Sequence, residues 1–154
     1  MEAKGLVTLL TDFGLEDGYV AAMKGVLLAR LPSATLVDVS HVVPRHDVVA
    51  GAFVLASVAP HFPVGTVHLA VIDPGVGSSR AALALETDRA WLVGPDNGLL
   101  LQAAGDRIRR SVQIEQVPGF ALDPCPTFHG RDLFAPAAAH LAGGGGHGGP
   151  RTTD

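Results

Sequence analysis

The segment LVTLLTDFGLEDGYVAAMKGVLLARLP, residues 6–32, contains the pattern that decides the fold. Its first six residues, Leu6–Thr11, form an apolar run that predicts a buried strand. Apolar residues then recur at helical spacing over Tyr19–Arg30, with Asp17 expected as the N-cap and Pro32 beyond the end. A strand followed directly by a helix is the repeating unit of α/β domains.

The same alternation continues along the rest of the chain. Further strands are predicted at Thr35–Val39, Thr66–Ile72, Ala81–Glu86, Ala90–Val93 and Ser111–Val117, and further helices at Asp47–Ala59, Gly98–Ala104 and Asp132–Leu141. We therefore predict an α/β fold with three layers and a mostly parallel central sheet. The short strands of residues 81–93 are candidates for an antiparallel pair.

Composition excludes several classes of protein. The chain has 154 residues, a length typical of one domain, and only 17% of them are charged, with a net charge of −4 and no basic stripe. Nucleic acid is therefore not expected as a partner. No apolar stretch is long enough to span a membrane, and the single cysteine, Cys125, cannot form an internal disulfide. We expect a cytoplasmic protein without a membrane segment.

The chain divides into two parts by composition. Residues 1–142 carry the strand and helix patterns, whereas residues 143–149 are glycine except for His147. Because such a segment cannot pack, we predict a flexible tail at 143–154, which is a linker, a truncation or a frameshifted end.

Ligands in open α/β sheets bind beyond the carboxyl ends of the strands, so polar residues there are the first candidates. Asp12 follows the first strand, where its carboxylate either caps a turn or accepts two hydrogen bonds from a ribose diol. DPGVG (73–77) follows the third strand, and its glycines let backbone approach a ligand closely or form a tight turn. Arg80 either folds back beside Asp73 or is an exposed surface residue.

Two later loops carry further candidates. In GPDNG (94–98), Asn97 offers an amide to a polar ligand, or the loop is a simple Asn-Gly turn. TFHGRD (127–132) places His129 close to an arginine and an aspartate, with Asp132 as the alternative helix cap.

Metal and nucleotide motifs are missing from the sequence. No histidine pair has His-Glu-x-x-His spacing, one cysteine cannot build a thiolate site, and residues 75–77 lack dinucleotide-binding and P-loop spacing. We expect no metal and no cofactor. A metal phosphohydrolase using Asp12, Asp73, Asp96 and His129 is a remaining alternative.

Seven segments together resemble the SAM hydroxide adenosyltransferase family, which includes S-adenosylmethionine (SAM) hydrolases and is related to fluorinase and chlorinase. The matching segments are TDFG (11–14), DGYV (17–20), MKG (23–25), VDVSH (37–41), DPGVG (73–77), GPDNG (94–98) and TFHGRDLFAPAAAHLA (127–142). The resemblance implies a large α/β domain, a homotrimer, and SAM as a substrate held between subunits. Family members continue into a smaller C-terminal β domain, which we expect to be absent here.

The resemblance also implies roles for individual residues. The family's catalytic aspartate, arginine and histidine fall on Asp73, Arg80 and His129. The substrate-binding residues are Asp12, which holds the ribose hydroxyls, and Asp17, His46, Asn97 and Thr127. Thr127 lines the substrate pocket, and His46 lies where the fluorinase has a tryptophan over the ribose.

The resemblance implies water as the nucleophile. The halogenating members of the family have tyrosines at the positions of Asp73 and His129, and this chain does not. The expected reaction is in-line attack of water on ribose C5′, giving adenosine and L-methionine. Asp73 and His129 are expected to accept hydrogen bonds from the water, and Arg80 to orient Asp73. The alternatives are a chlorinase-like halogenase and a non-catalytic fragment that binds SAM or adenosine.

Overall fold

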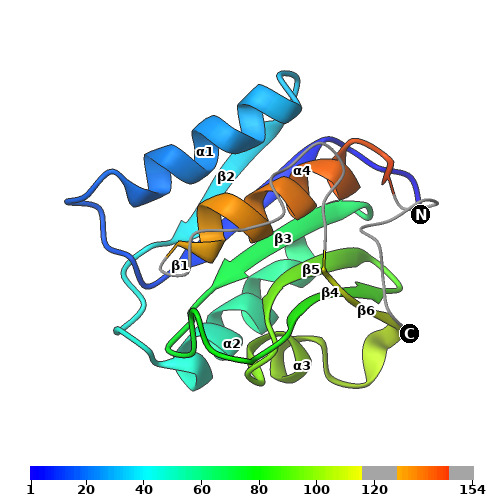
Figure 1. Ribbon diagram of the computed structural model, residues 1–154. Helices are drawn as coiled ribbons and strands as arrows, with labels where there is room; N and C mark the ends of the chain where they lie inside the picture. The colour runs from blue at the N-terminus through cyan, green and yellow to red at the C-terminus, as the bar shows by residue number, and fades with distance from the viewer. Residues whose placement is uncertain (116–127, 146–154) are drawn as a thin grey trace.

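A computed structural model describes residues 1–115 and 128–145, which form one six-stranded sheet covered by helices on both faces (Figure 1). The strands are β1 (Leu6–Thr11), β2 (Thr35–Ser40), β3 (Thr66–Val71), β4 (Ala82–Thr87), β5 (Ala90–Pro95) and β6 (Ile108–Gln113). The helices are α1 (Tyr19–Arg30), α2 (Val48–Val58), α3 (Leu99–Ala104) and α4 (Ala135–Ala142).

The sheet has the order β2-β1-β3-β5-β4-β6 and is mostly parallel, as predicted. Strands β2, β1, β3 and β5 pair in parallel, and β4 runs antiparallel to both β5 and β6. The antiparallel element is therefore the one expected from residues 81–93. The parallel strands end together at one edge of the sheet, so the loops after β1, β2 and β3 are neighbours there.

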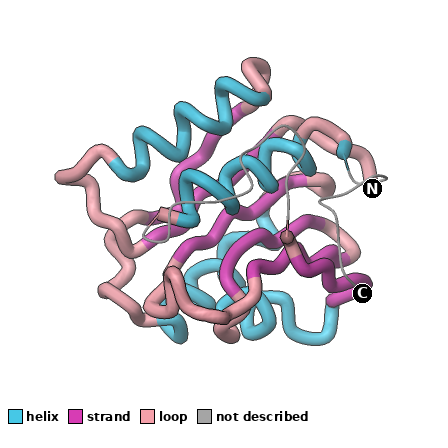
Figure 2. Tube along the Cα trace, viewed as in Figure 1, coloured by secondary structure: helices cyan, strands magenta, loops and turns pink. Residues whose placement is uncertain are grey.

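The three predicted layers are present (Figure 2). Helices α1 and α4 pack on one face of the sheet, around Met23, Leu27 and the buried alanines of α4. Helices α2 and α3 pack on the other face, around Leu55, Leu99 and Leu100. Since both faces of β3 are covered, all six of its residues are buried, including the polar Thr66 and His68.

Two predicted helix caps differ from the structure. Helix α1 begins as expected, but Gly18 and not Asp17 occupies its N-cap, and no side chain caps it. Asp132 does not cap the last helix, because it lies inside a π-helical turn, Gly130–Phe134, that precedes α4. The helix predicted to begin at Asp47 begins at Val48, and Asp47 caps it, since its Oδ1 accepts the N–H of Ala50 at 2.9 Å.

The remaining differences lie near the end of the described chain. Strand β6 begins at Ile108, three residues earlier than predicted. In the described part of the chain it is an edge strand paired with β4, and its exposed Arg109 and Arg110 interrupt the apolar pattern that predicts a strand. Residues 143–145 form a turn after α4, and the rest of the predicted tail lies outside the described residues. Within residues 1–115 and 128–145, no helix has the length and apolar character needed to cross a bilayer.

Candidate active site

The loops after β1, β2 and β3 meet the start of the π-helical turn around a cavity of about 230 Å³. Five of the predicted site residues line this cavity: Asp12, Asp17, His46, Asp73 and His129. They come from segments up to 117 residues apart in the chain (129 − 12) and are brought together by the parallel sheet and the last helix. The cavity is therefore the candidate active site.

Asp73, Arg80 and His129 form one connected cluster at this cavity. Arg80 Nε donates to Asp73 Oδ1 at 2.9 Å, and Arg80 Nη2 donates to Asp73 Oδ2. The same Nη2 lies 2.8 Å from His129 Nδ1. The structure thus brings together three residues that the sequence separates by 56 positions (129 − 73).

The loop after β3 folds Arg80 back onto Asp73. Val76 N donates to Asp73 O at 3.2 Å and Ser78 N to Gly75 O at 3.0 Å, so two successive turns reverse the chain. Gly77 has φ +77°, a conformation that residues with a Cβ rarely adopt. The guanidinium carbon of Arg80 lies 5.2 Å from the ring centroid of the buried Phe134, which holds it from the helix side.

The cluster is largely removed from solvent. The side chain of Asp73 is 5% exposed and that of Arg80 is 10% exposed, so their two-point ion pair is stronger than a surface pair. Burial, and then the charge of Arg80, lower the pKa of His129 below its ordinary value. We therefore assign a neutral His129 near neutral pH. Because a guanidinium only donates, Nδ1 accepts from Arg80 and the ring proton lies on Nε2.

Asp12 forms the opposite polar wall of the cavity. Its Oδ2 accepts the backbone N–H of His46 at 2.7 Å, and Oδ1 has no hydrogen-bond partner among the described residues. His46 has φ +63°, the only positive φ at a residue other than glycine in the described chain. Such strained backbone persists where surrounding contacts require it, and here it aims an N–H at a carboxylate.

Two predicted binding residues lie elsewhere. Asn97 does not line the cavity: its Nδ2 donates to Ile72 O at 2.8 Å and its Oδ1 accepts from Leu99 N at 3.2 Å. Its amide thus joins the end of β3 to the start of α3. Thr127 lies outside the described residues.

Aromatic residues that the sequence reasoning did not single out form another wall. The rings of Phe13, Tyr19 and Phe128 contact each other edge to face, with centroids 5.2 to 6.2 Å apart. All three line the cavity together with Arg45. Their sequence positions could have predicted this wall, because Phe13 and Phe128 are the chain neighbours of Asp12 and His129. Rings beside carboxylates favour a cationic ligand with apolar groups.

Among the described residues, no three or more histidine, cysteine, aspartate or glutamate side chains are grouped as a metal would need. Asp96, one of four residues in the phosphohydrolase alternative, is exposed and does not line the cavity.

Comparisons with known proteins agree with the fold and the motifs. An (R)-S-adenosyl-L-methionine hydrolase from Salinispora tropica is 50% identical over 138 residues, covering 88% of this chain and 52% of the relative. A fluorinase from an Actinoplanes species is more distant, at 28% identity over 94% of this chain and 57% of its own. The chain spans about half the length of these curated relatives.

One solved structure shares the fold of this chain, and one family model matches most of its length. The crystal structure of an uncharacterized conserved protein from Thermotoga maritima superposes with a TM-score of 0.86 at 40% identity, covering 90% of this chain and 54% of that one. The model of the SAM hydroxide adenosyltransferase N-terminal domain matches residues 7–148. The chain therefore belongs to the family of SAM hydroxide adenosyltransferase N-terminal domains.

Proposed function

We propose that this chain carries the catalytic cluster for hydrolysis of SAM to adenosine and L-methionine. The observation that supports it best is the contact between Asp73, Arg80 and His129 at a cavity whose other polar wall is Asp12. Relatives up to 50% identical are named (R)-S-adenosyl-L-methionine hydrolases, which supports the same substrate here.

The reaction needs positioning more than chemical activation. Water oxygen attacks ribose C5′, the C5′–S bond breaks, and the sulfur keeps the electron pair and becomes the neutral thioether of methionine. One proton is released from the water. Because the leaving group is already cationic, the protein has to align the water with C5′ and accept that proton.

The hydrogen bonds suggest different roles for Asp73 and His129. With Nδ1 engaged by Arg80, the Nε2–H of His129 donates to the water oxygen and orients it. The carboxylate of Asp73 retains lone pairs that accept the proton of the water. Both residues are expected from the sequence to accept, so this proposal replaces acceptance by His129 with donation.

The same cluster favours water over a halide ion. The carboxylate of Asp73 can accept a proton from an attacking water, whereas a halide carries no proton to give. The greater distance to the fluorinase, at 28% identity, agrees with this choice. Incubating the purified chain with SAM and chloride, then separating the products, should give adenosine. Formation of 5′-chloro-5′-deoxyadenosine would identify a halogenase, and nucleoside binding without product a non-catalytic module.

We further propose that the chain works as a cytoplasmic homotrimer whose subunits close the cavity between them. Val42, Val49 and Phe53, on and before α2, are 70%, 68% and 75% exposed, which is unusual for large apolar side chains. Sedimentation equilibrium should give a trimer mass that Phe53→Asp lowers, and a monomer mass for the unchanged chain would contradict the assembly.

A further inference from the structure

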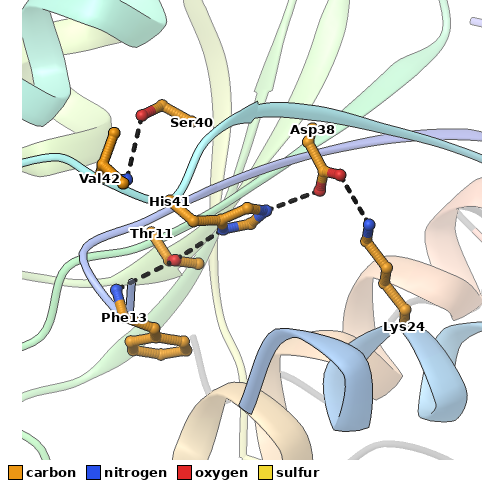
Figure 3. A network of polar contacts seen from close by, with 7 residues as sticks. All are labelled: Thr11, Phe13, Lys24, Asp38, Ser40, His41 and Val42. Carbon is orange, nitrogen blue, oxygen red and sulfur yellow. Dashed lines mark hydrogen bonds and ion pairs between the residues drawn. The ribbon is translucent and has the colours of Figure 1, made fainter. Parts of the chain in front are cut away.

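Four side chains form a continuous row of hydrogen bonds next to the loop that follows β1 (Figure 3). Lys24 Nζ lies 2.7 Å from Asp38 Oδ2, Asp38 Oδ1 lies 2.6 Å from His41 Nε2, and His41 Nδ1 lies 2.7 Å from Thr11 Oγ1. The row runs from α1 across the end of β2 to the last residue of β1. None of these four residues lines the cavity.

The row ends on both chain neighbours of Asp12. Thr11 Oγ1 accepts the N–H of Phe13 at 3.2 Å, and the backbone oxygen of His41 accepts the N–H of Gly14 at 2.7 Å. His41 therefore holds the loop before and after the carboxylate, although it does not touch Asp12 itself. This loop also carries Phe13 into the aromatic wall.

An irregularity in the sheet accompanies this arrangement. Leu9 pairs with Asp38 but Leu10 pairs with Ser40, so β2 has one more residue than β1 at this point. Extra residues of this kind redirect the side chains that follow them. Here the side chain that follows is His41, which is 3% exposed.

The donors and acceptors fit one protonation state. Burial alone would raise the pKa of Asp38, but hydrogen bonds from Lys24 and His41 outweigh it and hold this pKa below its ordinary value. The resulting carboxylate accepts from His41 Nε2–H, which leaves Nδ1 as an acceptor for the hydroxyl proton of Thr11. Thr11 then has its oxygen free to accept from Phe13 N–H.

A second threonine–histidine pair on the same strand shows what is special about the first. Thr8 Oγ1 lies 2.6 Å from His68 Nδ1, and both residues are about 1% exposed. His68 Nε2 is buried without a hydrogen-bond partner in the described part of the chain. A histidine can therefore be buried on this sheet without a carboxylate bonded to its Nε2. The hydrogen bonds from His41 to Asp38 and from Asp38 to Lys24 thus need an explanation other than burial.

We propose that His41 is a positioning residue that fixes the Asp12 loop for recognition of a ribose diol, and that Asp38 and Lys24 set its tautomer. This inference rests on the proposed function, with Asp12 holding the substrate ribose as the family resemblance implies. It concerns nucleoside recognition and is measured separately from hydrolysis.

The test compares the affinity of the chain for adenosine and for 2′,3′-dideoxyadenosine by calorimetry. Two hydrogen bonds to a carboxylate should make wild type prefer adenosine by about a hundredfold. His41→Ala should reduce this preference to less than about tenfold. His41→Asn should keep most of it, because the asparagine side chain can occupy the Nδ1 position. Asp38→Asn, at an exposed residue, should reduce it about threefold.

His68→Asn is the matched control, since it alters the other threonine–histidine pair and lies away from the cavity. It should lower the unfolding midpoint and leave the diol preference unchanged. If His41→Ala or Asp38→Asn also leaves the preference unchanged, His41 is a structural residue and the proposal is overturned.

Two further outcomes separate this inference from the proposed hydrolysis. A wild-type chain that binds neither nucleoside, or binds both equally, overturns the inference even if it hydrolyses SAM. A preference that falls in His41→Ala supports the inference even if the same preparation forms no adenosine from SAM.

Discussion

His129 and His68 are both partly or fully buried, and burial lowers the pKa of both. His68, with a pKa lowered to about 4, contacts Thr8 and packs edge to face on Phe62 inside the core. His129 borders the cavity and accepts from Arg80, which also holds Asp73. Burial therefore favours the neutral imidazole of both histidines. What distinguishes His129 as the candidate catalytic residue is its contact with the charged Arg80 and its place beside the cavity.

The largest expected effect comes from removing charge at the cavity. Asp73→Asn keeps the shape of the side chain but removes the acceptor for the proton of the water, so kcat for SAM hydrolysis should fall by about 10²–10⁴. His68→Asn is the comparison variant, because it changes a core imidazole and should leave kcat within about twofold. Equal losses in the two variants would end the distinction between the two sites.

The core imidazole should instead govern stability in acid. The pKa of His68 falls from 6.5 to about 4 on folding, so the unfolded chain takes up a proton first as pH drops. Stability present above pH 6.5 is lost between 6.5 and about 4, by about 3 kcal/mol in total. Urea unfolding of wild type and His68→Asn over this range measures the difference. A wild-type stability that follows that of the variant at every pH would contradict this account.

Replacing Asn97 should have a smaller effect, on stability and not on substrate binding. Asn97→Ala removes the hydrogen bonds to Ile72 O and from Leu99 N, which should lower the free energy of unfolding by about 1–2 kcal/mol. Because its amide is engaged by the backbone, KM for SAM should change less than about twofold. A large rise in KM with unchanged stability would return Asn97 to the substrate-binding residues.

The pH dependence of turnover gives the smallest predicted signal. Since burial and then Arg80 lower the pKa of His129, its imidazole is more than half neutral at pH 6.5, where an ordinary histidine is half protonated. The acid limb of kcat should therefore lie below pH 6.5. An acid limb of kcat centred above pH 6.5 would show that the pKa of His129 is raised and would contradict this prediction.

The order of strands and helices could be predicted because apolar periodicity differs sharply between them. The cavity lining could be predicted in part, because strand-end residues such as Asp12 and Asp73 meet wherever parallel strands end together. The role of Asn97 could not be predicted, because the sequence is the same whether an amide at a strand end binds a ligand or the backbone. The link from His41 to Thr11 depends on a register shift that has no sequence signature.

Local capping rules failed where tertiary contacts decided the backbone. Asp17 has a suitable type and position for an N-cap, yet Gly18 occupies the N-cap position and Asp17 lies at the cavity. Asp132 lies within a π-helical turn whose extra residue reorients the chain after His129. In both cases the departure from the local rule occurs at the candidate site.

The most direct test of the central claim is hydrolysis of SAM by the purified chain in water enriched with ¹⁸O, followed by mass spectrometry of the nucleoside. Attack of water on C5′, aligned by Asp73 and His129, predicts adenosine carrying ¹⁸O at the 5′ oxygen, and little or none from Asp73→Asn. Unlabelled adenosine, or equal labelled product from Asp73→Asn, would contradict the assignment of this cluster.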